Sequence, residues 1–452
     1  MALQKNQIIP LNVLTLSSDG CGVGRTDGMA VFVPFTAPGD RLLVRIVQVR
    51  KNYAYGIVAS LQVPGPGRQA PRCPSFTKCG GCCFEHLTYH AELEAKQQFV
   101  ADAFQRLGGL AAPMLPILPS PAPLRYRNKV QYPLTADENG HARIGFYAPR
   151  SHRVVPCTDC ILQPAQLNRI AATACRLLDQ MGIPVYDEAA HTGFARHLYL
   201  RHAVSTGKVL FCLVGNGSRM PQASEFCRQL TAAHPEISGI VLNVNMAQTN
   251  VITGGQNITL WGEGVLRDEL AGVPVALNPL SFYQVNTAGA EQLYAVARQF
   301  AELSGDETIL DLYCGAGTIG LSMASSCRRL IGVEVVPQAV EDARANAVRM
   351  GVRHGEFLCM DAGQAAAELA GRGLSPDVVI VDPPRKGCGP AALEPILRMA
   401  PRRIVMISCN AATAARDAAY LAPHYTVDAI RPVDLFPRTK HVECAVRFTR
   451  KH

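Results

Sequence analysis

The stretch Asp311-Leu-Tyr-Cys-Gly-Ala-Gly-Thr-Ile-Gly320 decides the fold of the carboxyl-terminal part of the chain. It ends the apolar segment TILDLY and leads into a helical one, so a strand is expected to pass into a helix through a glycine-rich turn. Gly315, Gly317 and Gly320 have the G-x-G-x-x-G spacing of turns that bind adenosine cofactors. Glu334 ends the next predicted strand, where its carboxylate can accept a hydrogen bond from a ribose.

Strands and helices alternate from about residue 281 onward, which predicts a parallel sheet. The expected strands read TILDLY, LIGVEV, EFLCMD, DVVIVD and RIVMIS, with helices such as PQAVEDARANAVRM between them. Polar residues follow the carboxyl ends of these strands, which is where open α/β sheets bind their ligands. We therefore predict an α/β, Rossmann-like domain over residues 281–452.

The carboxylate of Asp311 discriminates between two adenosine cofactors. A dinucleotide brings a pyrophosphate to the start of the helix, and a carboxylate at that place would repel it. S-adenosylmethionine carries a cationic sulfonium and an ammonium group, and no phosphate, so the same carboxylate attracts it. The sequence thus favours S-adenosylmethionine as the cofactor.

Two further domains are expected upstream. Residues 8–62 contain short β segments separated by turns, which predicts a small OB-like β-barrel over residues 1–64. The linker VPGPGRQAPRCP follows it. Residues 65–280 are expected to form an α+β middle domain that binds RNA and carries a cysteine cluster. Its helical part, at about residues 91–124, is expected to pack with the carboxyl-terminal domain.

The composition indicates a folded protein with a polyanionic partner. Of 452 residues, 48% are hydrophobic and 18% are charged, which excludes a mainly disordered chain. No apolar run approaches the roughly 18 residues of a membrane span, and no signal peptide is evident, so we expect a cytoplasmic protein with no membrane contact. The 44 basic and 36 acidic residues leave a formal charge of +8. Such an excess suits RNA, although an arginine-rich overall composition would also produce it.

The predicted middle domain concentrates cations among aromatic residues, a mixture that offers phosphate pairing and base stacking. A solvated β face with scattered cations would have the same composition. The cations are Arg125, Arg127, Lys129, Arg143, Arg150, His152 and Arg153, and the aromatic residues are Tyr126, Tyr132, Phe146 and Tyr147.

Two strand ends carry groups suited to methyl transfer onto a pyrimidine. Cys409, in Ser-Cys-Asn after RIVMIS, places a thiol where the methyl group of the cofactor would arrive. Pyrimidine C5 is too weak a nucleophile to take a methyl group until a thiolate has added to C6. That thiolate requires a cysteine pKa below the free value of about 8.5. Glu443, on a predicted terminal strand, is the candidate base that then removes the C5 proton.

Taken together, these residues resemble the RNA uracil-5-methyltransferase family, whose members methylate uridines of ribosomal or transfer RNA. The resemblance implies Cys409 as nucleophile, Glu443 as base, 23S ribosomal RNA as substrate and transfer RNA as the alternative. Some relatives have Asn where this chain has Thr318 and Asp361. The implied cofactor contacts are Gln284, Tyr313, Thr318, Glu334, Asp361 and Asp382. The motifs that carry the resemblance are a TRAM-type barrel, a cysteine cluster, Phe282–Asn286, Asp311–Gly320, Asp382–Arg385, Ser408–Asn410 and His441–Glu443.

The cysteine cluster begins with Cys73, Cys79 and Cys82, which a reducing cytosol would leave free to bind a metal. Cys160 fits the distant fourth cysteine of the family, and Cys157 is its rival. Four thiolates can bind a [4Fe-4S] cluster or a structural zinc ion, and the spacing does not decide between them. The resemblance favours the iron–sulfur cluster, in a structural role.

Two other functional classes remain alternatives to uridine C5 methylation. Asp382-Pro-Pro-Arg385 is similar to a loop with which some nitrogen methyltransferases hold a planar amine, but Arg385 replaces their aromatic residue. A non-catalytic RNA-binding assembly factor would need only the barrel, the basic face and the cysteines. Nothing in the sequence indicates a protein partner. Because the target base must reach Cys409, the enzyme is expected to take it out of its stack.

Overall fold

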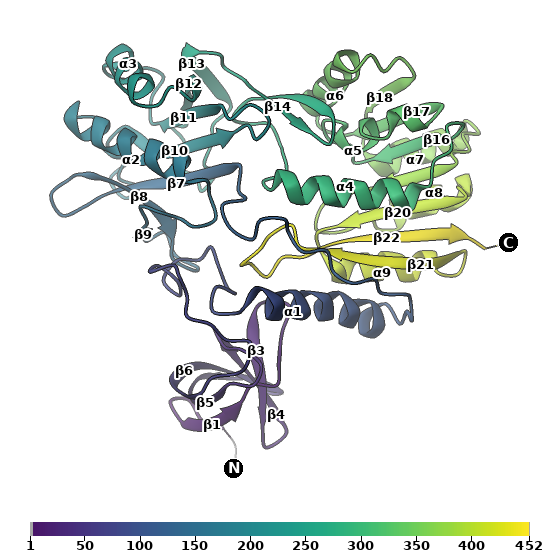
Figure 1. The fold of residues 1–452 in the computed structure, drawn as a ribbon, viewed down its shortest axis with the longest axis horizontal. Coiled ribbons are helices and arrows are strands. Elements are labelled where there is room, and N and C mark those ends of the chain that lie inside the picture. Colours follow the sequence, from purple (N-terminus) through teal and green to yellow (C-terminus); the bar gives the residue numbers. More distant parts are fainter. Residues whose placement is uncertain (1–2, 452) are drawn as a thin grey trace.

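The computed structural model describes residues 3–451 and is built around three large sheets (Figure 1). The amino-terminal sheet has the strand order β1-β5-β6-β4-β3-β2 and curls around a core that includes Val31, Val33, Val44 and Ile46. Buried and exposed residues alternate along β5, as expected of a strand with one face in a core. Its strands are β1 (Ile8–Asn12), β2 (Thr15–Leu16), β3 (Cys21–Thr26), β4 (Met29–Pro34), β5 (Arg41–Val49) and β6 (Tyr53–Val63).

The middle sheet has the order β13-β12-β11-β10-β7-β8-β9 and is antiparallel except for the pair β11 and β12. Helices α2 (Ala165–Gln180) and α3 (Ala223–Ala233) share a core with it. The strands are β7 (Lys129–Ala136), β8 (Ala142–Tyr147), β9 (Val154–Pro156), β10 (Ala195–His202), β11 (Val209–Gly215), β12 (Ile237–Val244) and β13 (Gln256–Gly262).

The carboxyl-terminal sheet has the order β18-β17-β16-β19-β20-β22-β21, and β22 alone runs antiparallel to its neighbours. This arrangement confirms the predicted Rossmann-like α/β fold. The strands are β16 (Thr308–Leu312), β17 (Arg329–Glu334), β18 (Gly355–Cys359), β19 (Val378–Val381), β20 (Arg403–Ser408), β21 (Tyr425–Val433) and β22 (Glu443–Arg450). The helices are α4 (Thr287–Ala301), α5 (Thr318–Leu321), α6 (Pro337–Arg349), α7 (Ala362–Gly371), α8 (Pro390–Met399) and α9 (Ala411–Leu421), with the short turn η2 (Ala324–Ser326) after α5.

Two segments that precede residue 281 pack on the carboxyl-terminal domain. Helix α1 (Tyr89–Asp102) and the π turn η1 (Ala103–Leu107) lie between the barrel and strands β21 and β22 (Figure 1), and Phe104 enters the core beside α9. The hairpin β14 (Leu266–Leu270) and β15 (Val273–Leu277) packs on α4 and α6. We propose the three-domain division at residues 64 and 280 with these two segments attached to the last domain.

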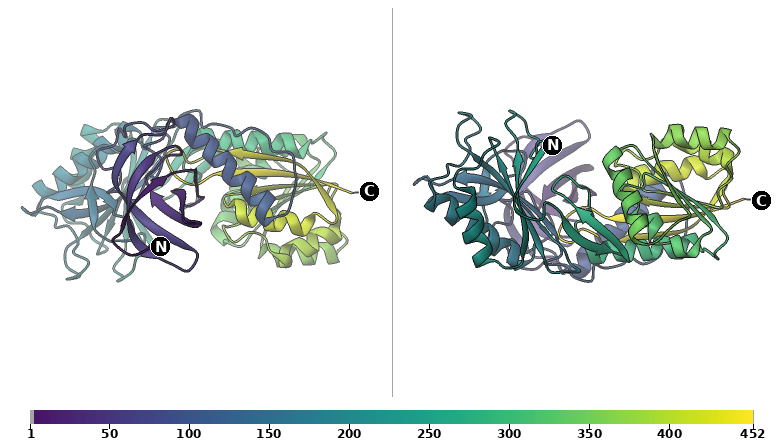
Figure 2. Two further views of the ribbon diagram at one scale, coloured as in Figure 1. Left: turned by 90° about the horizontal axis from the view of Figure 1, so that it is seen from below. Right: turned by 90° about the horizontal axis from the view of Figure 1, so that it is seen from above.

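Figure 2 shows the barrel and the middle sheet at one end of the molecule and the carboxyl-terminal sheet at the other. A buried charge network fastens the loop between β21 and β22 to α1. Lys96 Nζ donates to Glu92 Oε1 and to Asp434 Oδ1, each at 2.7 Å. The backbone N–H of Arg438 donates to Glu92 Oε1 at 2.7 Å. Because buried charges are costly unless paired, this network holds the loop that leads into Glu443 in one position.

Within residues 3–451, none of the helices combines the length and the apolar character that crossing a bilayer requires.

Candidate active site

Five functional side chains meet at one edge of the carboxyl-terminal sheet. Asp311, Glu334, Asp382 and Cys409 lie at the carboxyl ends of the parallel strands β16, β17, β19 and β20. Strand β22 is antiparallel, so its first residue, Glu443, lies at the same edge. The register that pairs Ser408 with Cys444 places Glu443 beside Cys409.

The glycine turn after β16 leaves an unsatisfied carboxylate oxygen. Gly315 and Gly317 have φ values of +55° and +76°, which an L side chain rarely adopts. Asp311 Oδ2 accepts a hydrogen bond from the N–H of Gly320 at 3.0 Å, whereas Oδ1 is buried without a partner. Burial raises the pKa of Asp311 to about 8, despite that hydrogen bond, and the nearby carboxylates of Asp382 and Glu334 add to the rise. A cation bound here would relieve this repulsion, which fits the charge of S-adenosylmethionine.

The other predicted cofactor residues near this turn differ in their hydrogen bonds, backbone conformation and exposure. Glu334 accepts from the N–H groups of Gly315 at 3.1 Å and Val336 at 2.9 Å. Tyr313 has a left-handed backbone with φ +64°. Asp361 is exposed and caps α7 by accepting from the N–H of Gly363 at 2.9 Å.

Gln284 is held by its backbone, since its carbonyl accepts from Asn128 Nδ2 at 2.8 Å. Thr318 Oγ1 shares a 2.9 Å hydrogen bond with the hydroxyl of Tyr294. Tyr294 is a residue that the sequence analysis missed, because on α4 it follows the pattern of a core position. Burial raises its pKa, and the charges of Asp382, Asp311 and Glu443 raise it further, which places the hydroxyl among the three carboxylates.

The thiol and the base lie in a negatively charged environment. Burial raises the pKa of Cys409, the carboxylates of Glu443 and Asp382 raise it further, and Arg385 opposes them. The low pKa that a thiolate nucleophile requires is therefore not present here, because the sulfur is partly buried and two acids lie near it. Burial raises the pKa of Glu443 to about 8, with Asp382 contributing, and burial raises that of Asp382 to about 6.

The loop after Asp382 is fastened to the start of α9. The carbonyl of Arg385 accepts from Asn410 Nδ2 at 3.1 Å and from the hydroxyl of Thr413 at 3.3 Å. The guanidinium of Arg385 lies 3.5 Å from the ring nitrogens of His441. Burial and the neighbouring cations lower the pKa of His441 to about 4, so the ring is neutral near pH 7. Arg385 is thus the cation that faces both the thiol and the base.

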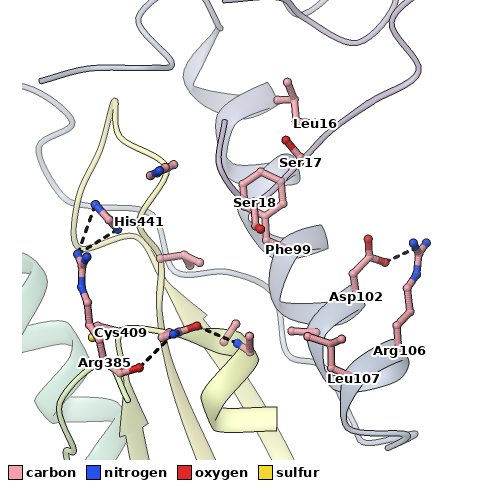
Figure 3. A pocket seen from close by; sticks show the side chains of 16 residues that line it. Leu16, Ser17, Ser18, Phe99, Asp102, Arg106, Leu107, Arg385, Cys409 and His441 are labelled. Carbon is pink, nitrogen blue, oxygen red and sulfur yellow. Dashed lines mark hydrogen bonds and ion pairs between the residues drawn. The ribbon is translucent and has the colours of Figure 1, made fainter. Parts of the chain in front are cut away.

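Cys409 opens into a cavity of about 380 Å³ between the barrel, α1 and the sheet edge. Figure 3 shows Cys409, Arg385 and His441 on one wall, with Phe99 and Arg106 on the opposite wall. The barrel contributes the segment 16–18. The sequence predicted the barrel and the thiol, but the cavity that joins them depends on the three-dimensional packing.

The cysteines of the predicted cluster share one neighbourhood. The charge of Cys160 acts on each of Cys73, Cys79 and Cys82. Cys157 hydrogen-bonds to Cys160, and this bond lowers the pKa of the Cys160 thiol to about 7. Within residues 3–451, however, no three His, Cys, Asp or Glu side chains stand in positions that already form a metal site.

Burial raises the pKa values of the Cys73, Cys79 and Cys82 thiols, whereas that of Cys160 is lowered. Arg127 has a buried Nε without a hydrogen-bond partner, and its charge opposes the rise at Cys79 and Cys82 and contributes to the lowered pKa of Cys160. The donor set therefore fits a thiolate-bound metal group by its chemistry, although the present positions of the sulfur atoms do not enclose one.

The arrangement agrees with comparisons to known proteins. A family model described as tRNA (Uracil-5-)-methyltransferase matches residues 276–451, and one described as TRAM domain matches residues 2–59. An uncharacterized RNA methyltransferase of Halalkalibacterium halodurans is 39% identical over 443 residues, which cover 98% of this chain and 96% of the relative. The chain belongs to the TRAM-domain RNA uracil-5-methyltransferase family. An RNA methyltransferase of Staphylococcus aureus is 37% identical over 451 residues, with 100% of both chains covered.

A solved structure extends the likeness of this RNA methyltransferase to the whole fold. The Pyrococcus abyssi tRNA (uracil-54, C5)-methyltransferase in complex with S-adenosyl-L-homocysteine matches with a TM-score of 0.77 and 28% identity. The match covers 97% of this chain and 99% of that one. As a member of the family, the protein is an enzyme that uses S-adenosylmethionine. The predicted fold class, the predicted family and S-adenosylmethionine as the methyl donor are thereby confirmed.

Proposed function

We propose that this methyltransferase transfers a methyl group to C5 of a uridine in RNA through a covalent adduct with Cys409. The observation that supports the proposal most strongly is the position of Cys409, which is half-buried beside Glu443 and reaches a cavity shared with the barrel. That cavity gives a flipped nucleotide a place next to the thiol. The Pyrococcus relative, by its name, acts on uracil C5 of transfer RNA.

In the first step of the proposed reaction, the thiolate of Cys409 adds to C6 of the uracil and leaves electron density at C5. S-adenosylmethionine, when bound, supplies an electrophilic methyl group and a positive charge at the sulfonium. C5 takes that methyl group as the carbon–sulfonium bond breaks. Glu443 then removes the C5 proton, the C5–C6 double bond re-forms, and the sulfur of Cys409 leaves as a thiolate.

The charged side chains at the sheet edge suit this order of reaction steps. Asp311 and Asp382 attract a cationic cofactor, whose charge lowers the pKa values of the neighbouring acids and of the thiol. Arg385 faces both Cys409 and Glu443 and favours the charged form of each. Gln284, Tyr313, Thr318, Glu334 and Asp361 are the remaining proposed cofactor contacts.

We further propose that Cys73, Cys79, Cys82 and Cys160 bind a [4Fe-4S] cluster, with zinc as the alternative. The cluster would fix the loop 79–84, whose N–H groups at Cys83 and Phe84 donate to the carbonyl of Arg438 at 3.0 and 3.2 Å. A visible absorption spectrum of anaerobically purified protein distinguishes the two metals, because zinc is colourless. Protein that retains neither iron nor zinc would contradict the metal assignment.

For the substrate we propose 23S ribosomal RNA, on the resemblance of the sequence motifs. Transfer RNA is the second candidate, favoured by the printed names of the matching family model and of the Pyrococcus relative. Mapping 5-methyluridine in ribosomal and transfer RNA from cells with and without the gene decides between them. Loss of a modified uridine in transfer RNA alone would refute the 23S assignment.

Two variants test the mechanism itself. Cys409→Ala is expected to abolish methylation and leave RNA binding in place. Glu443→Gln is expected to accumulate a covalent protein–RNA adduct that survives denaturing electrophoresis, since addition and methyl transfer precede its step. Turnover by the alanine variant would exclude Cys409 as nucleophile, and absence of an adduct would exclude Glu443 as base.

A further inference from the structure

Three cations from the middle domain are grouped without an acidic partner. Lys129 on β7 and Arg201 on β10 are paired residues of neighbouring strands, so their side chains lie on the same face of the sheet. Arg127 precedes Lys129 by two residues. The charges of both arginines act on Lys129, together with burial, and lower its pKa to about 8.

The group lacks counter-charges in the described part of the chain. The Nε atoms of Arg127 and Arg201 are buried without hydrogen-bond partners. Lys129 makes no side-chain hydrogen bond or ion pair with any of residues 3–451, and no carboxylate is among the groups that shift its pKa. Arg127 has the thiols of Cys82 and Cys160 beside it, and Arg201 has the hydroxyls of Tyr199 and Tyr283 and the thiol of Cys212. Clustered like charges that are partly removed from water are unfavourable until an anion joins them.

Other cations that the sequence singled out are already neutralised. Arg125 pairs with Asp159 at 2.7 Å, and Arg143 pairs with Asp137 at 2.5 Å. His152 lies 3.2 Å from a carboxylate oxygen of Glu188. Of the cations predicted from the sequence, Arg125, Arg143 and His152 therefore lie beside carboxylates, Arg127 and Lys129 belong to the unpaired group, and the exposed Arg150 and Arg153 belong to neither; the structure adds Arg201 to the unpaired group.

The unpaired group adjoins the active site. The guanidinium of Arg201 donates to the carbonyl of Ser281, directly before Phe282, whose side chain is 79% exposed. Asn128, the neighbour of Lys129, holds the carbonyl of Gln284. On the other side, the charge of Arg127 acts on His441 in the wall of the Cys409 cavity. The cations thus lie between the exposed aromatic ring and the catalytic edge.

We propose that Lys129, which is half-buried, binds a backbone phosphate of the RNA next to the target uridine, and that the buried charges of Arg201 and Arg127 behind it add to the attraction. The inference rests on the proposed function for the identity of the polyanion. A phosphodiester supplies the missing negative charge, and the ammonium group of Lys129 can donate charge-assisted hydrogen bonds to its oxygens. The phosphates would hold the strand while the base enters the cavity beside Cys409.

Lys129→Gln is the decisive variant, because Arg201 also holds Ser281 and its loss would disturb that segment. Lys208→Gln is the matched control, since it removes the same charge from an exposed turn of the middle sheet. Binding of a fluorescent single-stranded RNA of about 20 nucleotides is measured by anisotropy between about 50 and 200 mM salt. The slope of log K against log salt is negative, and one lost phosphate contact makes it less steep by about 0.7 for a single strand.

We expect Lys129→Gln to make the slope less steep by about this amount. Lys129→Arg is expected to restore the wild-type slope, and Lys208→Gln is expected to match the wild type. In methylation assays, Lys129→Gln is expected to raise KM for RNA while KM for S-adenosylmethionine is unchanged. An unchanged slope for Lys129→Gln, or an equal loss for Lys208→Gln, overturns the phosphate site. Binding is measured without turnover, so a wild-type enzyme that binds RNA but methylates no uridine would refute the proposed function alone.

Discussion

The buried base is expected to destabilise the protein at the pH where it works. Glu443 is 5% exposed, and burial raises its pKa from 4.5 to about 8. Below pH 4.5 the carboxyl is protonated in both the folded and the unfolded states and has no effect on the free energy of unfolding. Between pH 4.5 and 8 the unfolded chain releases the proton that the folded protein retains, so stability falls as pH rises.

The size of the effect follows from those two pKa values. Each pH unit between them is worth about 1.4 kcal/mol, so the wild type loses about 4 to 5 kcal/mol by pH 8. Glu443→Gln cannot ionise and avoids this loss. A domain of this size shifts its Tm by about 2 to 4 °C per kcal/mol. The variant is therefore expected to melt at least about 8 °C above the wild type at pH 9, and close to it at pH 5.

Differential scanning calorimetry of both proteins without cofactor, at several pH values, measures this difference. Glu291→Gln is the matched control, because it makes the same change at an exposed position on α4 and is expected to follow the wild type at every pH. A Tm difference for Glu443→Gln that stays constant from pH 5 to pH 9 would refute the buried, protonated carboxyl. Cofactor added at pH 9 is expected to narrow the gap, since its charge stabilises the ionised wild-type side chain.

Two further predictions concern the scaffold of the site. Lys96→Met leaves the buried carboxylate of Asp434 without its cation and Glu92 with Arg438 alone, at 3.4 Å, and the free energy of unfolding in urea is expected to fall by about 3 to 5 kcal/mol; an unchanged value would show that the network does not hold the loop before β22. Gly317→Ala places a Cβ at φ +76°, 3.0 Å from the ring of Phe357, and is expected to weaken S-adenosylmethionine binding measured by calorimetry. Gly373→Ala has a φ of +77° and open space around it, so it is expected to cost stability without changing cofactor affinity.

Sequence patterns predicted the parts of the structure that depend on local periodicity. The alternation of apolar strands and helices after residue 281 predicted the α/β fold, and the turn from Asp311 to Gly320 indicated an adenosine cofactor. Strand ends of a parallel sheet converge at one edge, so Asp382 and Cys409 could be expected to meet. Glu443 joined them because β22 is antiparallel, a direction that its sequence does not reveal.

Features built from distant segments escaped prediction. Tyr294 reads as a core residue of a helix, and its position among three carboxylates depends on how α4 packs. The cavity at Cys409 needs the barrel and α1, which are separated from the thiol by some three hundred residues of chain. Likewise, Arg125 and Lys129 are indistinguishable as cations in the sequence, and only the fold pairs the first with Asp159 and leaves the second unpaired.

The raised pKa of Cys409 implies that the cofactor binds before the thiol ionises. Burial, Glu443 and Asp382 all oppose ionisation of Cys409, whereas Arg385 and the backbone N–H of Cys409 itself favour it. A bound sulfonium cation adds positive charge on the cofactor side, where Asp311 and Asp382 lie, and so favours the thiolate and the ionised base together. Uridine that reaches the cavity before the cofactor therefore meets a protonated, weakly nucleophilic thiol. Under the proposed mechanism, the acids at the cofactor side thereby also keep the Cys409 thiol protonated until the methyl donor is bound.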